Sequence, residues 1–486
     1  MSIKKLWKGS RVWLLTGLLF LIAVPLSFNS CGSEYETPST TQTPTALISP
    51  ATLKAWMDAG LVNGTGYDRV VIIDLDTTGN YTTVGHIPGA RWLDAARLSE
   101  NRVEGPAVSS TEVATGARMD VLITELGITR NTTIVFTGGS YFYPARAYYT
   151  FRYWGFPKNR LKVLDGVNGT LAGTWRDLYA PVLPEPDFPT AALDPTPTAA
   201  ATTYSVTDNG TLRNDLRVSL SEMIDYAEGR VPNALAIDVR NIPTAGSYAG
   251  IVGSSGTGST FGTPPSPNLP WSADGTVFEG HINGAKAMLY SNVYNFVAGS
   301  PVVYGLFKDP STIASYFTAA SVGLDSTKTA YIYCKVGYMG AIAFFALDGI
   351  LGWPAAFYDG SWTQWGQLSG NTTLYGRLDP NSPWRTDIAS RTDSSSMKYS
   401  YADNDSSGAP DYAVELLTYD GSKCTGTVTT AGAESYYPPG CNLDPALYTV
   451  PVSSATSGNQ IEGDDIDYMK SGSGGGGSGG GGAPAC

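Results

Sequence analysis

The sequence is poor in charge and almost free of histidine. Charged residues make up 15% of its 486 residues, and there are two histidines. Acidic residues outnumber basic ones by 43 to 31, so the formal net charge is −12. Nucleic-acid binding needs a basic face, and we therefore expect no nucleic-acid partner. Low charge together with abundant Gly, Ser, Thr, Pro and Tyr is typical of an exported protein.

The sequence also lacks an apolar run of comfortable membrane-spanning length. The run Val12 to Leu26 is preceded by basic residues, which is the layout of a signal peptide. Cys31 follows and resembles the lipidated cysteine of a bacterial lipobox, although Phe28 and Asn29 are unusual there. Ordinary cleavage nearby and a retained anchor are the alternatives. We expect a signal peptide and lipobox in residues 1–31, and a protein of the cell envelope whose lipid anchors it in the periplasm or outer membrane.

Cysteine is scarce as well. The five cysteines are Cys31, Cys334, Cys424, Cys441 and Cys486. Cys424 and Cys441 lie in one segment rich in Gly, Tyr and Pro, and they are able to pair in an oxidising compartment. Cys486 ends a Gly-rich arm that also resembles an engineered linker. If Cys31 carries lipid, this leaves Cys334 and Cys486 without a partner in the sequence.

The chain repeats itself. The runs "VVIID" (Val70–Asp74) and "ALAID" (Ala234–Asp238) are both apolar and both end in aspartate. Each is followed by a Gly-His-Ile-x-Gly-Ala motif, which contains His86 in the first unit and His281 in the second. The two histidines of the chain therefore occupy the same motif, which chance placement explains poorly.

The second half of each unit agrees. When "TIVFTGG" is written above "AYIYCKVG", Thr137 falls opposite Cys334. The same number of residues then separates Thr137 from Gly155 and Cys334 from Gly352. Short apolar runs followed by helical spacing, repeated in both units, predict an α/β fold. We expect two tandem domains with mainly parallel sheets flanked by helices, plus a loop-rich C-terminal tail.

Composition suggests the boundaries of these parts. Residues 243–276 are rich in Gly, Ser and Pro and are expected to form a long surface loop. The acidic turn around Asp403 resembles a calcium loop but lacks a glutamate at its end, and solvated turns usually look like this. We expect no metal site and no cofactor. After the signal, the expected parts are a tether (32–47), a first domain (48–180), a linker (181–211), a second domain (212–380) and a loop-rich extension with a Gly-rich tail (381–486).

Cys334 stands between a strand end and a helix start. Backbone N–H groups in such a loop converge on one point, and the helix start adds partial positive charge, so a thiolate is favoured there. Gly337 lets the backbone fold closely around the sulfur, and Lys335 adds a positive charge. A free cysteine is often only a small buried hydrophobe. The strand-to-helix turn, where α/β sheets place their ligands, favours the chemical reading.

Several motifs in the second unit, "AIDVR", "GHINGA", "CKVGYM" and "YDGSW", resemble the signatures of the rhodanese superfamily. "IIDLD", "GHIPGA" and "VLDGV" in the first unit resemble them too. In tandem rhodaneses the first domain typically lacks the cysteine, as Thr137 indicates here. The resemblance implies that Cys334 is the nucleophile and that Asp238 and His281 are structural. The residues implied to form the substrate-binding loop and its rim are Lys335, Val336, Gly337, Tyr338, Met339 and Arg240.

Two departures from that family concern charge. Rhodaneses that use thiosulfate carry an arginine where this chain has Ser247, and a second loop cation where it has Val336. Related phosphatases have a longer loop closed by an arginine, which is absent here, so we do not expect phosphatase activity.

We therefore expect an exported sulfurtransferase. It would move sulfur from a donor such as thiosulfate to a thiol acceptor through a persulfide on Cys334, with the membrane as a partner through lipid on Cys31. The layout also resembles rhodanese-like lipoproteins of selenite and tellurite reduction operons, so selenium is a possible cargo. The alternative is a non-catalytic lipoprotein that uses the same fold as a binding or assembly module.

Overall fold

The computed structural model describes residues 45–168, 197–240, 281–298, 303–366, 382–392 and 457–472, with short gaps at 76–78, 80, 83–85, 387 and 389, and a few isolated residues elsewhere. The predictions for the signal peptide, most of the tether, Cys31, the 243–276 loop, the Asp403 turn, Cys441 and Cys486 lie outside these residues. So does the side chain of Cys424. Among the helices of the described residues, none is long and apolar enough to cross a membrane.

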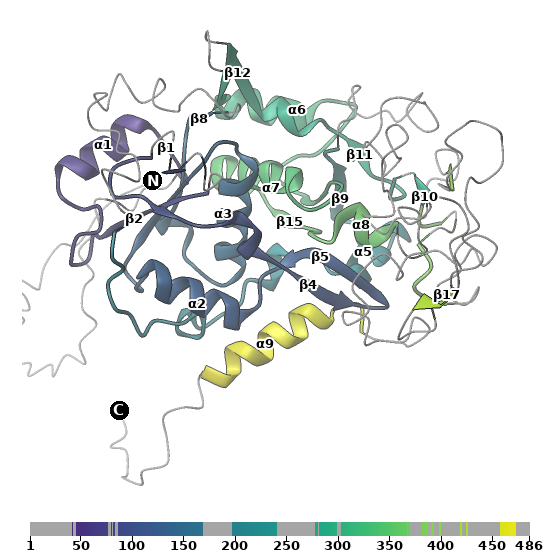
Figure 1. The fold of residues 1–486 in the computed structure, drawn as a ribbon. Coiled ribbons are helices and arrows are strands. Elements are labelled where there is room, and N and C mark those ends of the chain that lie inside the picture. Colours follow the sequence, from purple (N-terminus) through teal and green to yellow (C-terminus); the bar gives the residue numbers. More distant parts are fainter. Residues whose placement is uncertain are drawn as a thin grey trace, which may run out of the picture. The chain divides into compact units, whose positions relative to one another are not determined.

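Each repeat contains one parallel sheet (Figure 1). The first has the order β1 (Leu47–Ile48), β7 (Leu161–Leu164), β6 (Thr133–Thr137), β2 (Val70–Asp74) and β3 (Arg91–Trp92). The second has the order β15 (Ala355–Phe357), β14 (Thr329–Tyr333), β9 (Ala234–Asp238) and β11 (Lys286–Ala287). All these pairs are parallel. The expected α/β fold with mainly parallel sheets flanked by helices is confirmed.

Local sequence explains where the outer helices begin. Ser49, Thr115, Ser219 and Asp309 each accept a hydrogen bond from the first turn of the following helix. A proline in the first turn adds to this signal in two of them. The helices that these residues cap are α1 (Pro50–Asp58), α2 (Gly116–Leu126), α5 (Leu220–Ala227) and α6 (Pro310–Thr318).

Two central helices join the repeats. α3 (Phe142–Tyr153) follows β6, and α7 (Met339–Phe344) follows the cysteine loop and continues into the π-helix η8 (Phe345–Leu351). α3 packs against α7 (Figure 1), with Tyr148 on Phe345 and Tyr149 on Phe344 at ring distances of 4.9 and 5.2 Å. Because both helices are buried nearly all round, the two repeats share one apolar core.

Two hairpins cross between the repeats. In the first repeat, β4 (Ser99–Glu104) pairs with β5 (Ala107–Val113), and in the second, β12 (Tyr294–Ala298) pairs with β13 (Val303–Phe307). The N–H of Val113 donates to Asp359 of the second repeat at 2.8 Å. The N–H of Phe307 donates to Asp165 of the first repeat at 3.0 Å. Each repeat therefore holds the Asp-Gly turn of the other.

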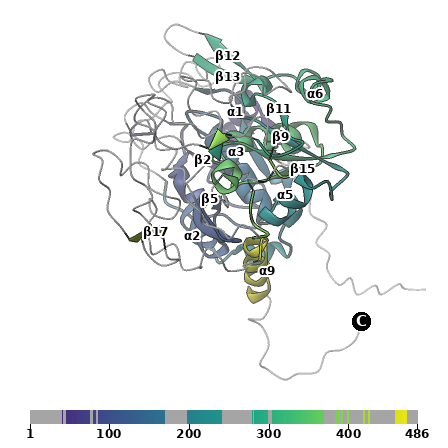
Figure 2. The same cartoon turned by 90° about the vertical axis from the view of Figure 1, so that its right-hand side faces the viewer.

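A C-terminal helix, α9 (Gln460–Gly472), packs along β4 and α2 (Figure 1), and Figure 2 shows it from the side. Asp465 accepts two hydrogen bonds from Arg102, both at 2.8 Å, and one from Tyr153 at 2.8 Å. The prediction of a loop-rich extension did not anticipate this helix. The remaining strands are β8 (Val167–Asn168), β10 (Phe278–Glu279), β16 (Lys398–Tyr399), β17 (Thr418–Tyr419) and β18 (Cys424–Thr425). The remaining helices are η2 (Ala95–Leu98), η3 (Lys158–Arg160), η5 (Val206–Asn209), η6 (Asn214–Leu216), η7 (Tyr290–Val293) and α8 (Ser361–Trp365).

Candidate active site at the cysteine loop

Strand register corrects the comparison of the two loops. Asp74 pairs with Thr137 across β2 and β6, whereas Asp238 pairs with Tyr333 across β9 and β14. Thr137 is therefore equivalent to Tyr333, and the residue equivalent to Cys334 is Gly138. The alignment that placed Thr137 opposite Cys334 is shifted by one residue here. It remains true that the first repeat has no cysteine at this position.

The one-residue shift has a counterpart in the second central helix. Gly155 and Gly352 end the two helical segments in the left-handed conformation, at φ values of 86° and 70°. Counted from the equivalent strand ends, the second repeat has one residue more than the first. A π-helical turn takes up one residue more than an α-helical turn, and η8 lies in this segment. An ungapped sequence comparison cannot detect such a change.

The thiol of Cys334 is enclosed by its loop. The residue has no exposed surface. Its Sγ accepts a hydrogen bond from the N–H of Gly337 at 3.2 Å and a longer one from the hydroxyl of Ser361 at 3.9 Å. Both donors would stabilise negative charge on this sulfur, or on a second sulfur bonded to it.

Gly337 is required at its position by space and by backbone conformation. Its φ is +79°, in the region that residues with a side chain rarely adopt. A Cβ there would lie 2.6 Å from the carbonyl oxygen of Asp359. The loop therefore packs directly on the Asp-Gly turn that follows β15, as the close folding expected of Gly337 requires.

Ser361 was quoted in a family motif but given no role by the sequence. Its hydroxyl accepts the N–H of Cys334 at 3.2 Å, and its single proton is shared between the carbonyl of Tyr358 at 3.0 Å and Sγ of Cys334 at 3.9 Å. Its φ is +52°, which is uncommon for a residue with a side chain. Strain held at a residue that touches a candidate nucleophile points to a functional role.

A charged cluster lies beneath the loop, and the sequence analysis missed it. Arg217 is fully buried and donates to Asp359 at 2.9 Å, Glu104 at 2.8 Å and Glu112 at 2.9 Å. Glu462 of α9 adds a fourth carboxylate at 3.1 Å. These partners are far apart in sequence, so no local pattern reveals them.

The cluster shifts the pKa values of two of its acidic members, Asp359 and Glu112, in opposite directions. Burial alone would raise the pKa of Asp359, but the guanidinium groups of Arg217 and Arg146 lower it below its ordinary value. Burial raises the pKa of Glu112 well above its ordinary value, and the charge of Asp359 adds to this. The two carboxyl groups therefore titrate as a pair in which Asp359 gives up its proton more readily than Glu112.

The other predicted residues lie around this core. Arg240 is buried, holds the Asp238 carboxylate at 2.6–3.0 Å, and stacks over the ring of Trp362 at 4.7 Å. His281 is buried, with Nδ1 3.1 Å from the carbonyl of Ile282. The substrate-binding role of Arg240 and the structural roles of Asp238 and His281 stay predictions.

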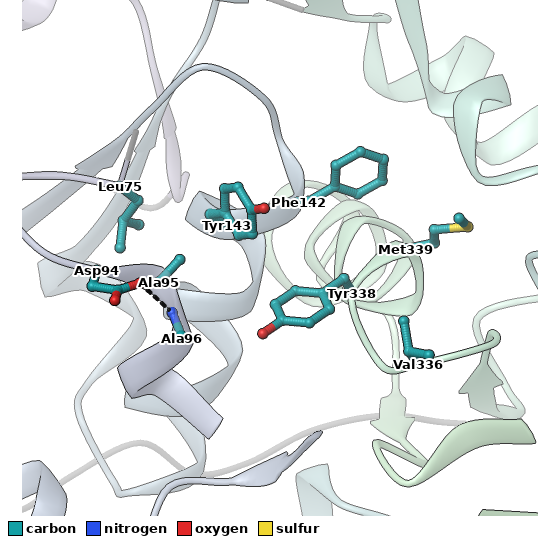
Figure 3. A pocket seen from close by; sticks show the side chains of 9 residues that line it. All are labelled: Leu75, Asp94, Ala95, Ala96, Phe142, Tyr143, Val336, Tyr338 and Met339. Carbon is teal, nitrogen blue, oxygen red and sulfur yellow. Dashed lines mark hydrogen bonds between the residues drawn. The ribbon is translucent and has the colours of Figure 1, made fainter. Parts of the chain in front are cut away.

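A cavity of about 350 Å³ adjoins the loop (Figure 3). Val336, Tyr338 and Met339 line one side of it, and the first repeat lines the other. The residues from the first repeat are Leu75, Asp94, Ala95, Ala96, Phe142 and Tyr143. Tyr143 and Tyr338 meet edge to face at 5.8 Å. Of the six residues implied to bind substrate, Val336, Tyr338 and Met339 border the cavity. Gly337 lies deeper, against Sγ of Cys334.

Comparisons with known proteins add evidence that the geometry cannot give. A search of protein-family models finds no match. The chain is 27% identical over 305 residues to "Sulfur carrier protein TtuD" of Thermus thermophilus, covering 62% of this chain and 90% of that protein. It is 24% identical over 308 residues to a Haloferax volcanii protein named "Putative thiosulfate sulfurtransferase", covering 62% and 87%.

Two solved structures are also similar to the chain. Tum1 from Saccharomyces cerevisiae matches with a TM-score of 0.47 at 20% identity, over 67% of this chain and 96% of that one. The 3-mercaptopyruvate sulfotransferase SseA from Escherichia coli matches with a TM-score of 0.43 at 19% identity, over 65% and 99%.

The sequence relatives and the internal repeat agree. The relatives align over about 300 residues, which is most of their own length, and the present chain folds as two equivalent parallel sheets. Over about 300 residues the chain is therefore similar to proteins named as a sulfur carrier and as thiosulfate sulfurtransferases, and its two tandem repeats agree with the resemblance to the rhodanese superfamily.

Proposed function

We propose that the protein carries sulfur as a persulfide on Cys334, taking it from a donor such as thiosulfate and passing it to a thiol acceptor. The observation that carries the proposal is the enclosure of Sγ, which receives the N–H of Gly337 at 3.2 Å. The names of the sequence relatives, a sulfur carrier and a thiosulfate sulfurtransferase, support this choice of cargo.

The two half-reactions balance without an oxidant. The Cys334 thiolate attacks the outer sulfur of thiosulfate, the S–S bond of the donor breaks, and sulfite leaves with the bonding electrons. Cys334 then carries S–S⁻. An acceptor thiolate attacks the terminal sulfur, takes it as its own persulfide, and regenerates the Cys334 thiolate. The Gly337 N–H and the Ser361 hydroxyl stabilise the sulfur anion before and after transfer.

The charges around the loop favour weak binding of a dianionic donor. Lys335 is half-buried in the loop, whereas Arg240 holds Asp238 and Arg146 holds the carbonyl of Gly337. The cavity beside the loop is mostly apolar and carries the carboxyl of Asp94. We therefore expect thiosulfate to need a high concentration, and a less charged donor such as mercaptopyruvate to load Cys334 at lower concentration.

The cellular setting remains part of the proposal. Export through residues 1–31, a lipid on Cys31 and a place in the cell envelope rest on the signal-like N-terminus. Selenium as a second cargo rests on chemistry, because a selenium anion would suit the same donors as a sulfur anion.

A non-catalytic binding module is the second candidate. One observation favours it: the thiol of Cys334 has no exposed surface, so a donor reaches it only if the loop shifts.

Mass measurement of the intact protein decides between the two. The purified full chain is incubated separately with thiosulfate, mercaptopyruvate and polysulfide, and the mass of each product is measured. The enzyme predicts the gain of one chalcogen atom with at least one donor, and no gain in Cys334→Ser. If the folded protein gains no mass with any donor, the sulfurtransferase proposal fails and the non-catalytic binding module is the remaining candidate.

A further inference from the structure

A buried arginine of the first repeat reaches the cysteine loop of the second. Arg146 lies on α3 and is 1% exposed. Its Nη1 donates to the carbonyl of Gly337 at 3.1 Å, and its Nη2 donates to the carbonyl of Thr111 on β5 at 2.6 Å. One guanidinium thus ties the hairpin of the first repeat to the loop that holds Cys334.

One carboxylate and three aromatic rings surround the guanidinium of Arg146. Asp359 lies 3.5 Å from Nη2. The rings of Tyr149 and Phe357 lie 5.3 and 5.7 Å from the guanidinium carbon, and that of Tyr338 lies at 6.0 Å. The planar, forked group of arginine suits such a site, since it can stack on rings while it donates in two directions.

The contact matters because of where it falls on Gly337. The same residue donates its N–H to Sγ of Cys334 at 3.2 Å and offers its carbonyl to Arg146 at 3.1 Å. Gly337 has no side chain to restrict its backbone, as its φ of +79° shows. Nothing within the residue itself therefore fixes the direction of its N–H. The carbonyl and the N–H of Gly337 lie in successive peptide planes that meet at its Cα, so holding the carbonyl restrains the position of the residue and of the N–H that faces the sulfur.

The second repeat provides no equivalent arginine from α7 to the loop of the first repeat. The helix equivalent to α3 is α7, whose sequence MGAIAF contains no charged residue. The residues of α7 that correspond to Arg146 are Ile342 or Ala343, depending on where the extra residue is counted, and both are buried. The loop around Gly138 therefore receives no arginine from α7.

We propose that the cysteine-free first repeat acts as a part of the active site, and that Arg146 is its positioning residue, holding Gly337 so that its N–H faces the sulfur of Cys334. The idea that this affects sulfur transfer rests on the function proposed above. The effect of Arg146 on the reactivity of the Cys334 thiol does not rest on that function, and it can be measured without any sulfur donor.

Three variants test the proposal in the full chain. Arg146→Met removes the guanidinium and keeps much of its volume. Arg152→Met is the matched control, because Arg152 lies on the same helix and binds Asp348 of the second repeat at 3.2 Å without touching the loop. Arg146→Lys keeps the charge and one donor able to reach Gly337. The rate of Cys334 alkylation by iodoacetamide is followed by peptide mass, and melting temperature is recorded for each variant.

We expect Arg146→Met to speed alkylation of Cys334 about tenfold, because the enclosed thiol is reached only when the loop shifts and the hydrogen bond that holds Gly337 is lost. Arg146→Lys should restore part of the protection. Arg152→Met should melt earlier yet react within about twofold of the parent. Equal acceleration in Arg146→Met and Arg152→Met, or no acceleration in Arg146→Met, would overturn the proposal. Faster alkylation in Arg146→Met of a protein that accepts no sulfur would uphold it while refuting sulfur transfer.

Discussion

Asp165 in the first repeat and Asp359 in the second occupy equivalent Asp-Gly turns, yet their surroundings differ. Asp165 accepts the Tyr141 hydroxyl at 2.8 Å and the N–H of Phe307 at 3.0 Å, and burial raises its pKa. Asp359 accepts the N–H of Val113 in the same way, but two arginines also surround it. Burial opposes its ionisation, and the arginines more than offset this, so its pKa falls below the ordinary value.

The difference shows what the second repeat has added to a shared scaffold. Both repeats have the sheet, the crossing hairpin and the turn. Only the second has a cysteine at the strand end and, among the residues that the structure describes, such a buried charge cluster beneath it. The cluster draws on partners from both repeats and from α9, namely Glu104, Glu112, Arg146, Arg217 and Glu462. The reactive loop is therefore built on the whole assembly and not on one repeat.

Replacing the two aspartates separately should give the largest contrast. Asp359→Asn removes the negative charge between Arg217 and Arg146 and is expected to cost about 3–5 kcal/mol of folding free energy, as loss of one partner from a buried ion pair does. Asp165→Asn should cost less than about 1 kcal/mol, because both of its hydrogen bonds end on Oδ1 and an amide oxygen can accept them.

Urea unfolding of the two variants measures these costs. Similar losses in both would show that the turns are electrostatically alike, and would remove the basis of the comparison.

A cysteine placed in the first repeat asks whether the loop position alone creates reactivity. Gly138→Cys puts a thiol at the place equivalent to Cys334, without the Gly337 and Ser361 donors. We expect its alkylation to be slower than that of Cys334 by about a hundredfold, roughly the effect of two missing charge-stabilising hydrogen bonds. Alkylation kinetics resolved by peptide mass give both rates in one chain. Equal alkylation rates would mean that the position at the strand end is sufficient to make a cysteine reactive.

Ser361 offers a smaller test, since the equivalent position in the first repeat is Val167 in strand β8. Ser361→Gly and Ser361→Ala both remove the hydroxyl that faces Cys334, and both should slow sulfur loading about tenfold. Ser361→Gly should be the more stable of the two, because glycine adopts the φ of +52° at no steric cost.

Loading rates and melting temperatures together test this pair. If loading proceeds at the parental rate in both variants, the hydroxyl is a structural group only.

The last test concerns the pH dependence that Glu462 brings, a residue which α9 adds to the second repeat alone. Burial raises the pKa of Glu462 to about 8, against an ordinary value of 4.5. Between these two pH values the unfolded glutamate loses its proton while the folded one keeps it. The stability that Glu462 contributes is therefore full below about pH 4.5 and is lost as the pH rises towards 8.

Glu462→Gln should remove this loss, because the amide stays neutral and its oxygen can still accept from Arg217. We expect the melting temperature of the parent to fall by a few degrees relative to Glu462→Gln between pH 5 and pH 8. Parallel melting curves across that range would show that Glu462 is ionised in the folded protein.

The sequence predicts the repeats well because their signals are local. The buried runs Val70–Asp74 and Ala234–Asp238 each form the predicted strand, and Cys334 follows a strand and precedes a helix as expected. The rhodanese resemblance rests on the same short motifs.

The sequence could not predict features that depend on distant partners. Arg217 meets Glu104 and Glu462, which lie more than a hundred residues away on either side, and no periodicity connects them. The one-residue shift between Thr137 and Cys334 is visible only in strand register. Arg146 reads as an ordinary residue of a Tyr-rich helix until the fold brings it to Gly337.

Site mapping of the transferred sulfur tests the central claim most directly. The full chain is loaded with donor, trapped with an alkylating reagent and digested, and each cysteine peptide is examined for an added sulfur. We predict one sulfur per chain, on the peptide that contains Cys334. Sulfur on other cysteines at the same level, or a loaded chain in which the Cys334 peptide carries none, would contradict the account.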